Sequence, residues 1–253
     1  MAPIRQFAYI FWFSAPIFHL VLAIIMRRKR LDLEFPMFFR YLVFKVCRSV
    51  LLFATRELSP GPEYVAYFFL YWLSEVVEIV LSLAVVYELF YNTFGRYEAL
   101  KKVIPLFFHW ATGILILMST VAVASSPAGD ASRLMVGVLS LKQGATIVEL
   151  GLLLLLFSAA NFFQVSWKHY VFGIAMGFAL HASVEVIAVT FRVRLGMIAQ
   201  SGWNFVNGAA YHCAIVIWIV HLLSRARTHD MEIDIPQSNL EEWNTTLRGM
   251  MRQ

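Results

Sequence analysis

Seven long apolar segments follow one another along the chain, and short polar or Gly/Pro-containing connections separate them. A helix needs about 20 mostly apolar residues to cross a membrane, because the hydrocarbon layer is about 30 Å thick and a helix rises about 1.5 Å per residue. The segments that meet this length are residues 7–26, 36–56, 65–90, 104–124, 134–157, 169–191 and 203–223. They are continuously apolar rather than alternating, which favours helices over the strands of a membrane barrel. We therefore predict an all-α integral membrane bundle of seven transmembrane helices.

The connections between these segments are too short to form a second domain. They carry helix-breaking sequences such as SPGPE at 59–63 and SSPAGD at 125–130. We expect one transmembrane domain over residues 1–224 and a tail over residues 225–253. Within the tail, Ser238 and Glu241 have the spacing of a capping box and precede an apolar stripe, which predicts a short amphipathic helix. This helix could fold back onto the bundle, or dock a cytoplasmic or membrane protein partner.

Composition agrees with a chain that contacts membrane lipids. Of the 253 residues, 60% are hydrophobic and 15% are charged, whereas soluble domains have about 25% charged residues. We expect a multi-pass protein of the cell (inner) membrane.

Basic residues in the connections predict the orientation. Connections on one side of the predicted bundle, together with the start of the tail, carry ten Lys and Arg residues, including the run Arg27–Arg30, and the opposite side carries five. Because positively charged short loops stay cytoplasmic, we expect the N-terminus outside and the C-terminus in the cytoplasm. The net charge of +5 then reports topology, and we expect no nucleic acid partner.

Two cations lie near the middle of the second segment, where an isolated charge is costly. These are Lys45 and Arg48, and the third segment carries Glu75 and Glu78 one turn apart. The short turn between the segments makes them antiparallel neighbours, so residues at equal depth have a constant sum of residue numbers. The couples Arg48 with Glu75 and Lys45 with Glu78 have the same sum, which predicts two ion pairs. Such pairs could serve only to fix the register of the two helices.

Further polar residues lie at similar depth in the last three segments. Each segment places them on one helix face, and in the sixth segment Gly173 and Gly177 continue that face and allow close approach of a neighbouring helix. We expect all of these side chains to line one polar cavity that opens outward. The candidate ligand-binding residues are Lys45, Arg48, Glu75, Glu78, Lys142, Glu149, His181, Glu185, Asn207, Tyr211 and His212.

Metal or haem chemistry is the less favoured interpretation of the histidines. His181 and His212 have similar predicted depths and could ligate a metal or haem together with Glu185. No compact metal-binding motif such as H-E-x-x-H is present. We therefore expect no cofactor and no metal, and an enzyme is the less favoured class. We expect the two cysteines, Cys47 and Cys213, to be small buried core residues.

Three classes of function stay open. The seven-span topology is shared with rhodopsins and seven-helix receptors, but the last segment, 203–223, contains no lysine for a retinal Schiff base. The favoured class is a receptor-like or sensory protein that binds a small polar or amphiphilic ligand, because the polar residues crowd the outer half of the predicted bundle. The first alternative is a transporter of a small solute or of protons, and the second is an intramembrane metal-dependent enzyme. A structural subunit of a larger membrane complex also fits the sequence.

Overall fold

The computed structural model describes residues 2–58, 65–95, 97–125, 130–163, 165, 169–195 and 200–224, with side chains near several helix ends outside the described set. All regular structure in these ranges is helical. The helices are α1 (Ala2–Arg28), α2 (Leu31–Glu34), α3 (Pro36–Leu58), α4 (Val65–Phe94), α5 (Glu98–Ala124), α6 (Asp130–Phe162), α7 (His169–Leu195) and α8 (Gln200–Leu223). Each predicted apolar segment lies within one long helix, and the short α2 was not predicted. The predicted amphipathic tail helix lies outside the described residues.

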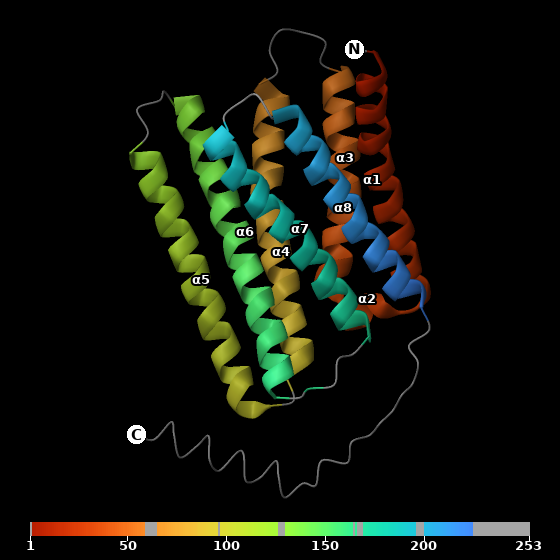
Figure 1. Ribbon diagram of the computed structural model, residues 1–253, viewed down its shortest axis with the longest axis vertical. Coiled ribbons are helices and arrows are strands. Elements are labelled where there is room, and N and C mark those ends of the chain that lie inside the picture. Colours follow the sequence, from red (N-terminus) through yellow and green to blue (C-terminus); the bar gives the residue numbers. More distant parts are fainter. Residues whose placement is uncertain are drawn as a thin grey trace, which may run out of the picture.

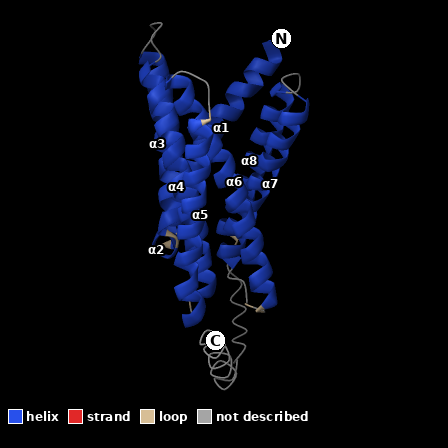
Figure 2. Cartoon of the chain, turned by 90° about the vertical axis from the view of Figure 1, so that its left-hand side faces the viewer, coloured by secondary structure: helices blue, strands red, loops and turns tan. Residues whose placement is uncertain are grey.

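Six of the long helices form a closed ring. Going around it, α1 packs on α3, α3 on α4, α4 on α6, α6 on α7, α7 on α8, and α8 returns to α1. The helix α5 lies outside the ring, where it packs on α6 and α4 (Figure 1). The long helices run from one end of the bundle to the other, with α7 and α8 oblique to α5 and α6 (Figure 1). α2 lies at the end of the bundle where α3 begins (Figure 2). Side chains from six helices can therefore meet inside the ring, and α5 is excluded.

Five described helices, α4 to α8, are long and apolar enough to cross a membrane. They indicate a multi-pass membrane protein. α3 is more charged, because Arg40, Lys45 and Arg48 fall within its first 18 residues. The most exposed large apolar side chains include Trp110 and Leu117 on α5, as expected for a helix outside the ring whose surface faces lipid.

Glycines let α7 and α8 pack closely, as the spacing of Gly173 and Gly177 predicts. A Cβ atom at Gly173 would overlap the His221 ring, and one at Gly177 would overlap the Trp218 indole. The Trp218 Nε1 group donates to the Ile174 carbonyl at 3.1 Å. The indole is therefore buried between the two helices with its polar group satisfied.

Part of the ring interior is an apolar core, which packs the helices together beside the polar part. Phe38 of α3 and Phe178 of α7 both contact the Trp218 ring, with centroids 5.2 and 5.0 Å apart. Fully buried leucines from α1, α4 and α6 complete this core. Phe178 also borders the polar layer, which is formed by the charged groups of Lys45, Arg48, Glu75, Glu78, Lys142 and Glu185.

A buried carboxylate holds the start of α3 in place. Glu88 of α4 accepts hydrogen bonds from the backbone N–H groups of Met37, at 2.8 Å, and Phe38, at 3.0 Å. Helix N-termini leave such donors unpaired and carry partial positive charge. Pro36 begins the helix and has no N–H. Glu88 therefore replaces a local cap, and it aligns α3 with α4.

The prediction that both cysteines are buried is wrong. Cys47 and Cys213 are exposed on the outer surface of the bundle. The reason is helical geometry, because Cys47 is adjacent to Arg48 and is turned about 100° away from it. When Arg48 faces the interior, Cys47 faces outward.

Candidate polar site

Two ion pairs join α3 to α4 at the positions that the residue sums predict. The Lys45 Nζ atom lies 2.7 Å from Glu78 Oε1. Arg48 pairs with Glu75, and it also pairs with Glu78 through its second terminal nitrogen. One guanidinium thus joins both carboxylates, in the fork geometry that suits arginine. The sequence predicted the two pairs but not this additional contact.

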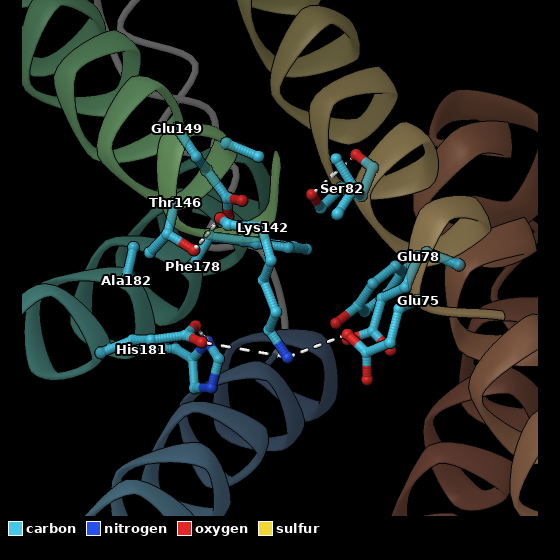
Figure 3. Close-up of a pocket in the computed structure, with 13 residues that line it drawn as sticks. Glu75, Glu78, Ser82, Lys142, Thr146, Glu149, Phe178, His181 and Ala182 are labelled. Carbon is cyan, nitrogen blue, oxygen red and sulfur yellow. Dashed lines mark hydrogen bonds and ion pairs between the residues drawn. The ribbon is translucent and has the colours of Figure 1, made fainter. Parts of the chain in front are cut away.

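Lys142 of α6 extends the network across the ring. Its Nζ atom lies 2.9 Å from Glu75 Oε2 and 4.0 Å from Glu185 Oε1 of α7. Glu185 in turn lies 4.0 Å from His181 Nδ1, one turn away on the same helix. Figure 3 shows the Lys142 side chain extended between the two glutamates of α4 and His181. Charged groups from four helices therefore form one continuous chain.

This chain has a tightly paired half and a loosely paired half. Among the described residues its cations are Lys45, Arg48 and Lys142, and its carboxylates are Glu75, Glu78 and Glu185. The Glu75 side chain is 6% exposed, whereas Lys142, where the two halves meet, is 36% exposed. The α3 and α4 charges are thus desolvated and directly paired, while the contacts at Glu185 leave room for water or a ligand.

Tyr211 of α8 connects the ion network to a group of histidines. Lys45 Nζ lies 4.8 Å from the centre of the Tyr211 ring, in cation–π geometry. The His181 ring contacts the same tyrosine edge to face, with centroids 4.9 Å apart. The Tyr211 hydroxyl lies 2.8 Å from Nε2 of His19 on α1. Five helices of the ring, α3, α4, α6, α7 and α8, therefore carry predicted site residues, and α1 completes the set.

His19 was missed by the sequence analysis. It is 1% exposed, and its Nδ1 atom lies 2.6 Å from the Ala15 carbonyl. A carbonyl only accepts, so in the neutral ring Nδ1 carries the hydrogen and Nε2 accepts from the Tyr211 hydroxyl. The available signal was a single histidine within an apolar segment, which is expensive to bury unless it has partners.

His212 contacts polar groups other than those of His181. Its Nδ1 atom contacts the Gly208 carbonyl at 2.8 Å, and its Nε2 atom contacts the Ser14 hydroxyl at 2.8 Å. The Tyr211 ring contacts both histidines, with centroids 4.9 Å from His181 and 6.4 Å from His212. Within the described part of the chain, no group of three or more His, Cys, Asp or Glu residues is arranged to hold a metal ion.

A small polar cavity lies between α4, α6 and α7. Its volume is about 40 Å³, and Glu149, Thr146 and Ser82 line it together with the ion network. A water needs about 10–15 Å³ measured in this way, so the cavity can hold a few waters or a compact group. Pockets for drug-sized ligands measure about 300–1,000 Å³, so a larger ligand would require the helices to separate.

Two buried polar atoms near the network lack a hydrogen-bond partner in the described structure. They are Nε of Arg48 and Oδ1 of Asn207. One is a donor and the other is an acceptor, and such groups are usually satisfied by water or a ligand when protein partners are missing. Both residues belong to the predicted site, so Arg48 and Asn207 each leave one buried polar atom unassigned by the described contacts.

Comparison with known proteins adds no relatives. No protein-family model matches the chain, and no curated protein or solved structure is significantly similar to it. The function has to be inferred from the site itself.

Proposed function

We propose that the protein is a receptor-like or sensory membrane protein of seven spanning helices, with its N-terminus outside and its C-terminus in the cytoplasm. A small polar ligand inserts beside Lys142, between the tightly paired glutamates of α4 and the loosely paired Glu185 of α7. α1 and α3 are the two additional spans, because both complete the ring with four of the five apolar helices, α4, α6, α7 and α8.

The observation that carries this proposal is the asymmetry at Lys142. Its Nζ atom lies 2.9 Å from Glu75 but 4.0 Å from Glu185. The longer contact can be exchanged for a ligand at little cost, since a charge pair at this separation does not form a good hydrogen bond. A ligand that replaces it would remove this polar contact between α6 and α7 and thereby change how the two helices pack, as a sensory protein requires.

The size of the cavity defines the ligand class. About 40 Å³ accommodates a compact polar molecule of a few heavy atoms. The neighbouring charges, Lys142 and Glu185, fit a small anion, cation or zwitterion. Formate, acetate, methylammonium and glycine are suitable probes because together they cover these charge types.

Thermal unfolding of the purified protein with each probe tests the proposal. A ligand at 100 times its Kd stabilises the folded state by about 2.7 kcal/mol. We expect at least one probe to raise the melting temperature of the wild type but not that of Lys142→Met. If every probe changes the melting temperature of the wild type and of Lys142→Met equally, the proposal that a ligand binds at Lys142 is wrong. Glu34→Gln, outside the polar layer, is the matched control and retains the shift.

Transport is the second candidate, and Glu149 favours it, because this buried carboxyl lines the cavity yet forms no ion pair with a described cation. Glu75, Glu78, Glu149, Glu185 and His181 are the exchange groups of this alternative. Uptake of the stabilising probe into proteoliposomes distinguishes the two classes. A receptor-like protein binds the probe without uptake, whereas a transporter accumulates it.

A further inference from the structure

Glu149 lies at the end of the cavity that the ion network does not occupy. Glu149 is 8% exposed. It faces Ser82 of α4 across the cavity, with Thr146 one turn before it on α6 (Figure 3). The Glu149 carboxyl and the Ser82 hydroxyl both line this part of the cavity. This part of the cavity is built from oxygen atoms of three side chains.

The two hydroxyl groups have already used their hydrogens. Thr146 Oγ1 donates to the Lys142 carbonyl at 3.0 Å, and Ser82 Oγ donates to the Ile79 carbonyl at 3.0 Å. A hydroxyl has one hydrogen to donate, so both groups present only lone pairs to the cavity. Glu149 and Ser82 can then bond to each other only if the carboxyl supplies the hydrogen.

The charge balance of the interior points in the same direction. The three carboxylates of the network, Glu75, Glu78 and Glu185, already face three cations. Glu149 is a fourth carboxyl in the same interior, and it forms no ion pair with a cation of the described residues. A buried carboxylate without a counterion is strongly destabilised, so such a group takes up a proton or a cation.

Among the residues that the structure describes, no unpaired cation lines the cavity beside Glu149 and could replace a proton. The groups that face the cavity are Glu75, Glu78 and Ser82 of α4, Lys142 and Thr146 of α6, His181 and Glu185 of α7, and Tyr41 of α3. On its other side α6 packs against α5, which contributes the apolar Leu115 to that contact. Glu149, Ser82 and Thr146 supply only the two carboxyl oxygens and two hydroxyl oxygens, whereas a divalent metal ion needs about six oxygen ligands. A proton needs one acceptor.

We propose that Glu149 and Ser82 form a proton-binding site, in which the neutral Glu149 carboxylic acid donates its hydrogen to Ser82 Oγ. The site is separate from the ion-paired network and does not depend on ligand binding at Lys142. Opening of the cavity to water would hydrate the carboxylate, release the proton and return a negative charge to the space beside Thr146. The protein thus holds an exchangeable proton, which is released when the helices around the cavity move and let water in.

Infrared spectroscopy of the protein in lipid at neutral pH tests this proposal. A protonated carboxylic acid gives a C=O stretching band well separated from the carboxylate and amide bands, and the band shifts in D₂O. We expect this band in the wild type and its loss in Glu149→Gln. Ser82→Ala should keep the band but shift its frequency, because the hydrogen bond to Ser82 is lost. Glu185→Gln is the control with an ion-paired carboxyl, and it should leave the band unchanged.

Two results would overturn the proposal. One is a spectrum in which Glu149→Gln retains the full acid band of the wild type in sodium-free buffer. The other is a band that disappears when NaCl replaces choline chloride at constant pH, which would make Glu149 a sodium site. Glu149→Gln is expected to fold normally, because glutamine has the shape and charge of the neutral acid, and its melting temperature should equal that of the wild type.

Discussion

The Lys45 ammonium lies 2.7 Å from the Glu78 carboxylate, although the two residues belong to different helices and both side chains are less than one-fifth exposed. Glu78 also pairs with Arg48. The pair therefore fixes α3 against α4 at the level of the polar layer. Its removal should lower the free energy of unfolding of the whole bundle.

Removing one partner of this pair should destabilise the fold more than removing both. Glu78→Gln leaves the Lys45 charge buried without a carboxylate, and breaking a buried pair in this way costs about 3–5 kcal/mol. Lys45→Met combined with Glu78→Gln removes the orphaned charge and should recover part of this loss. The free energy of unfolding in detergent measures each variant.

The exposed pair of Arg27 and Asp32 is the matched control. Its nitrogen and oxygen lie 2.9 Å apart, but the arginine side chain is 74% exposed. Asp32→Asn should therefore cost about 0–1 kcal/mol. Lys45→Met alone is measured as well. The interpretation of Lys45 and Glu78 as a coupled pair is wrong if the double variant loses as much free energy of unfolding as the two single variants lose together.

Glu88 should be needed for the start of α3 although it lies outside the polar cavity. Glu88→Ala leaves the N–H groups of Met37 and Phe38 without their acceptor, at a cost of about 1–3 kcal/mol for each buried donor. Glu88→Gln keeps one acceptor oxygen and should lose less. Denaturant unfolding orders the variants, and equal stability of Glu88→Ala and the wild type would contradict the capping role.

Close packing of α7 on α8 should depend on Gly177. Gly177→Ala places a Cβ atom within 2.8 Å of Trp218 Cδ1, and such overpacking costs about 1–3 kcal/mol. Gly113→Ala on α5 is the control, because its Cβ would meet nothing within 4 Å. It should gain up to about 1 kcal/mol from helix propensity. A melting temperature that is the same for both variants would show that the glycine face does not set the packing.

A strained residue follows α1. Arg30 adopts the left-handed conformation with a φ of 56°, which costs a residue with a Cβ about 1–2 kcal/mol. Arg30→Gly should relieve this cost and raise the melting temperature. Arg30→Ala, which keeps the Cβ atom, should not. An equal response of the two variants would mean that the charge of Arg30 matters and its backbone does not.

The helices and two of the ion pairs could be predicted from the sequence because both follow from regular spacing. Apolar length defines the helices, and an antiparallel turn relates Lys45 to Glu78 through their numbers alone. The additional Arg48 to Glu78 contact could not be predicted, since it depends on side-chain conformation. His19 and Glu88 were missed for a different reason. Glu88 accepts from backbone N–H groups of α3, which no side-chain pattern marks. His19 is a single polar residue in an apolar segment, and its side-chain partner Tyr211 is 192 residues away in the sequence.

The lateral arrangement of the helices also required the structure. Spacing predicts that polar faces exist on the segments containing Lys142, His181 and Tyr211, but not that the faces converge. The ring that excludes α5 brings them together. The sequence contained one hint of this exclusion, because the segment 104–124 carries few polar residues.

Sided thiol labelling tests most directly whether the polar cavity opens to the outside. The natural thiols cannot report on it, because Cys47 and Cys213 are exposed on the bundle surface, so both are replaced by serine. Ala182 lines the cavity and is 1% exposed, and Ala182→Cys places a thiol inside it. Ile147→Cys, on the exposed face of the same bundle, is the control for labelling through lipid.

A membrane-impermeant, positively charged thiol reagent is applied to right-side-out and to inverted membranes. Our account predicts that Ala182→Cys reacts from the outside only, and that a probe which stabilises the protein changes the rate. Reaction from both sides would contradict the receptor-like proposal and establish alternating access. Reaction from neither side, with an unfolded control fully labelled, would contradict an accessible cavity and leave the charged network as a purely structural contact.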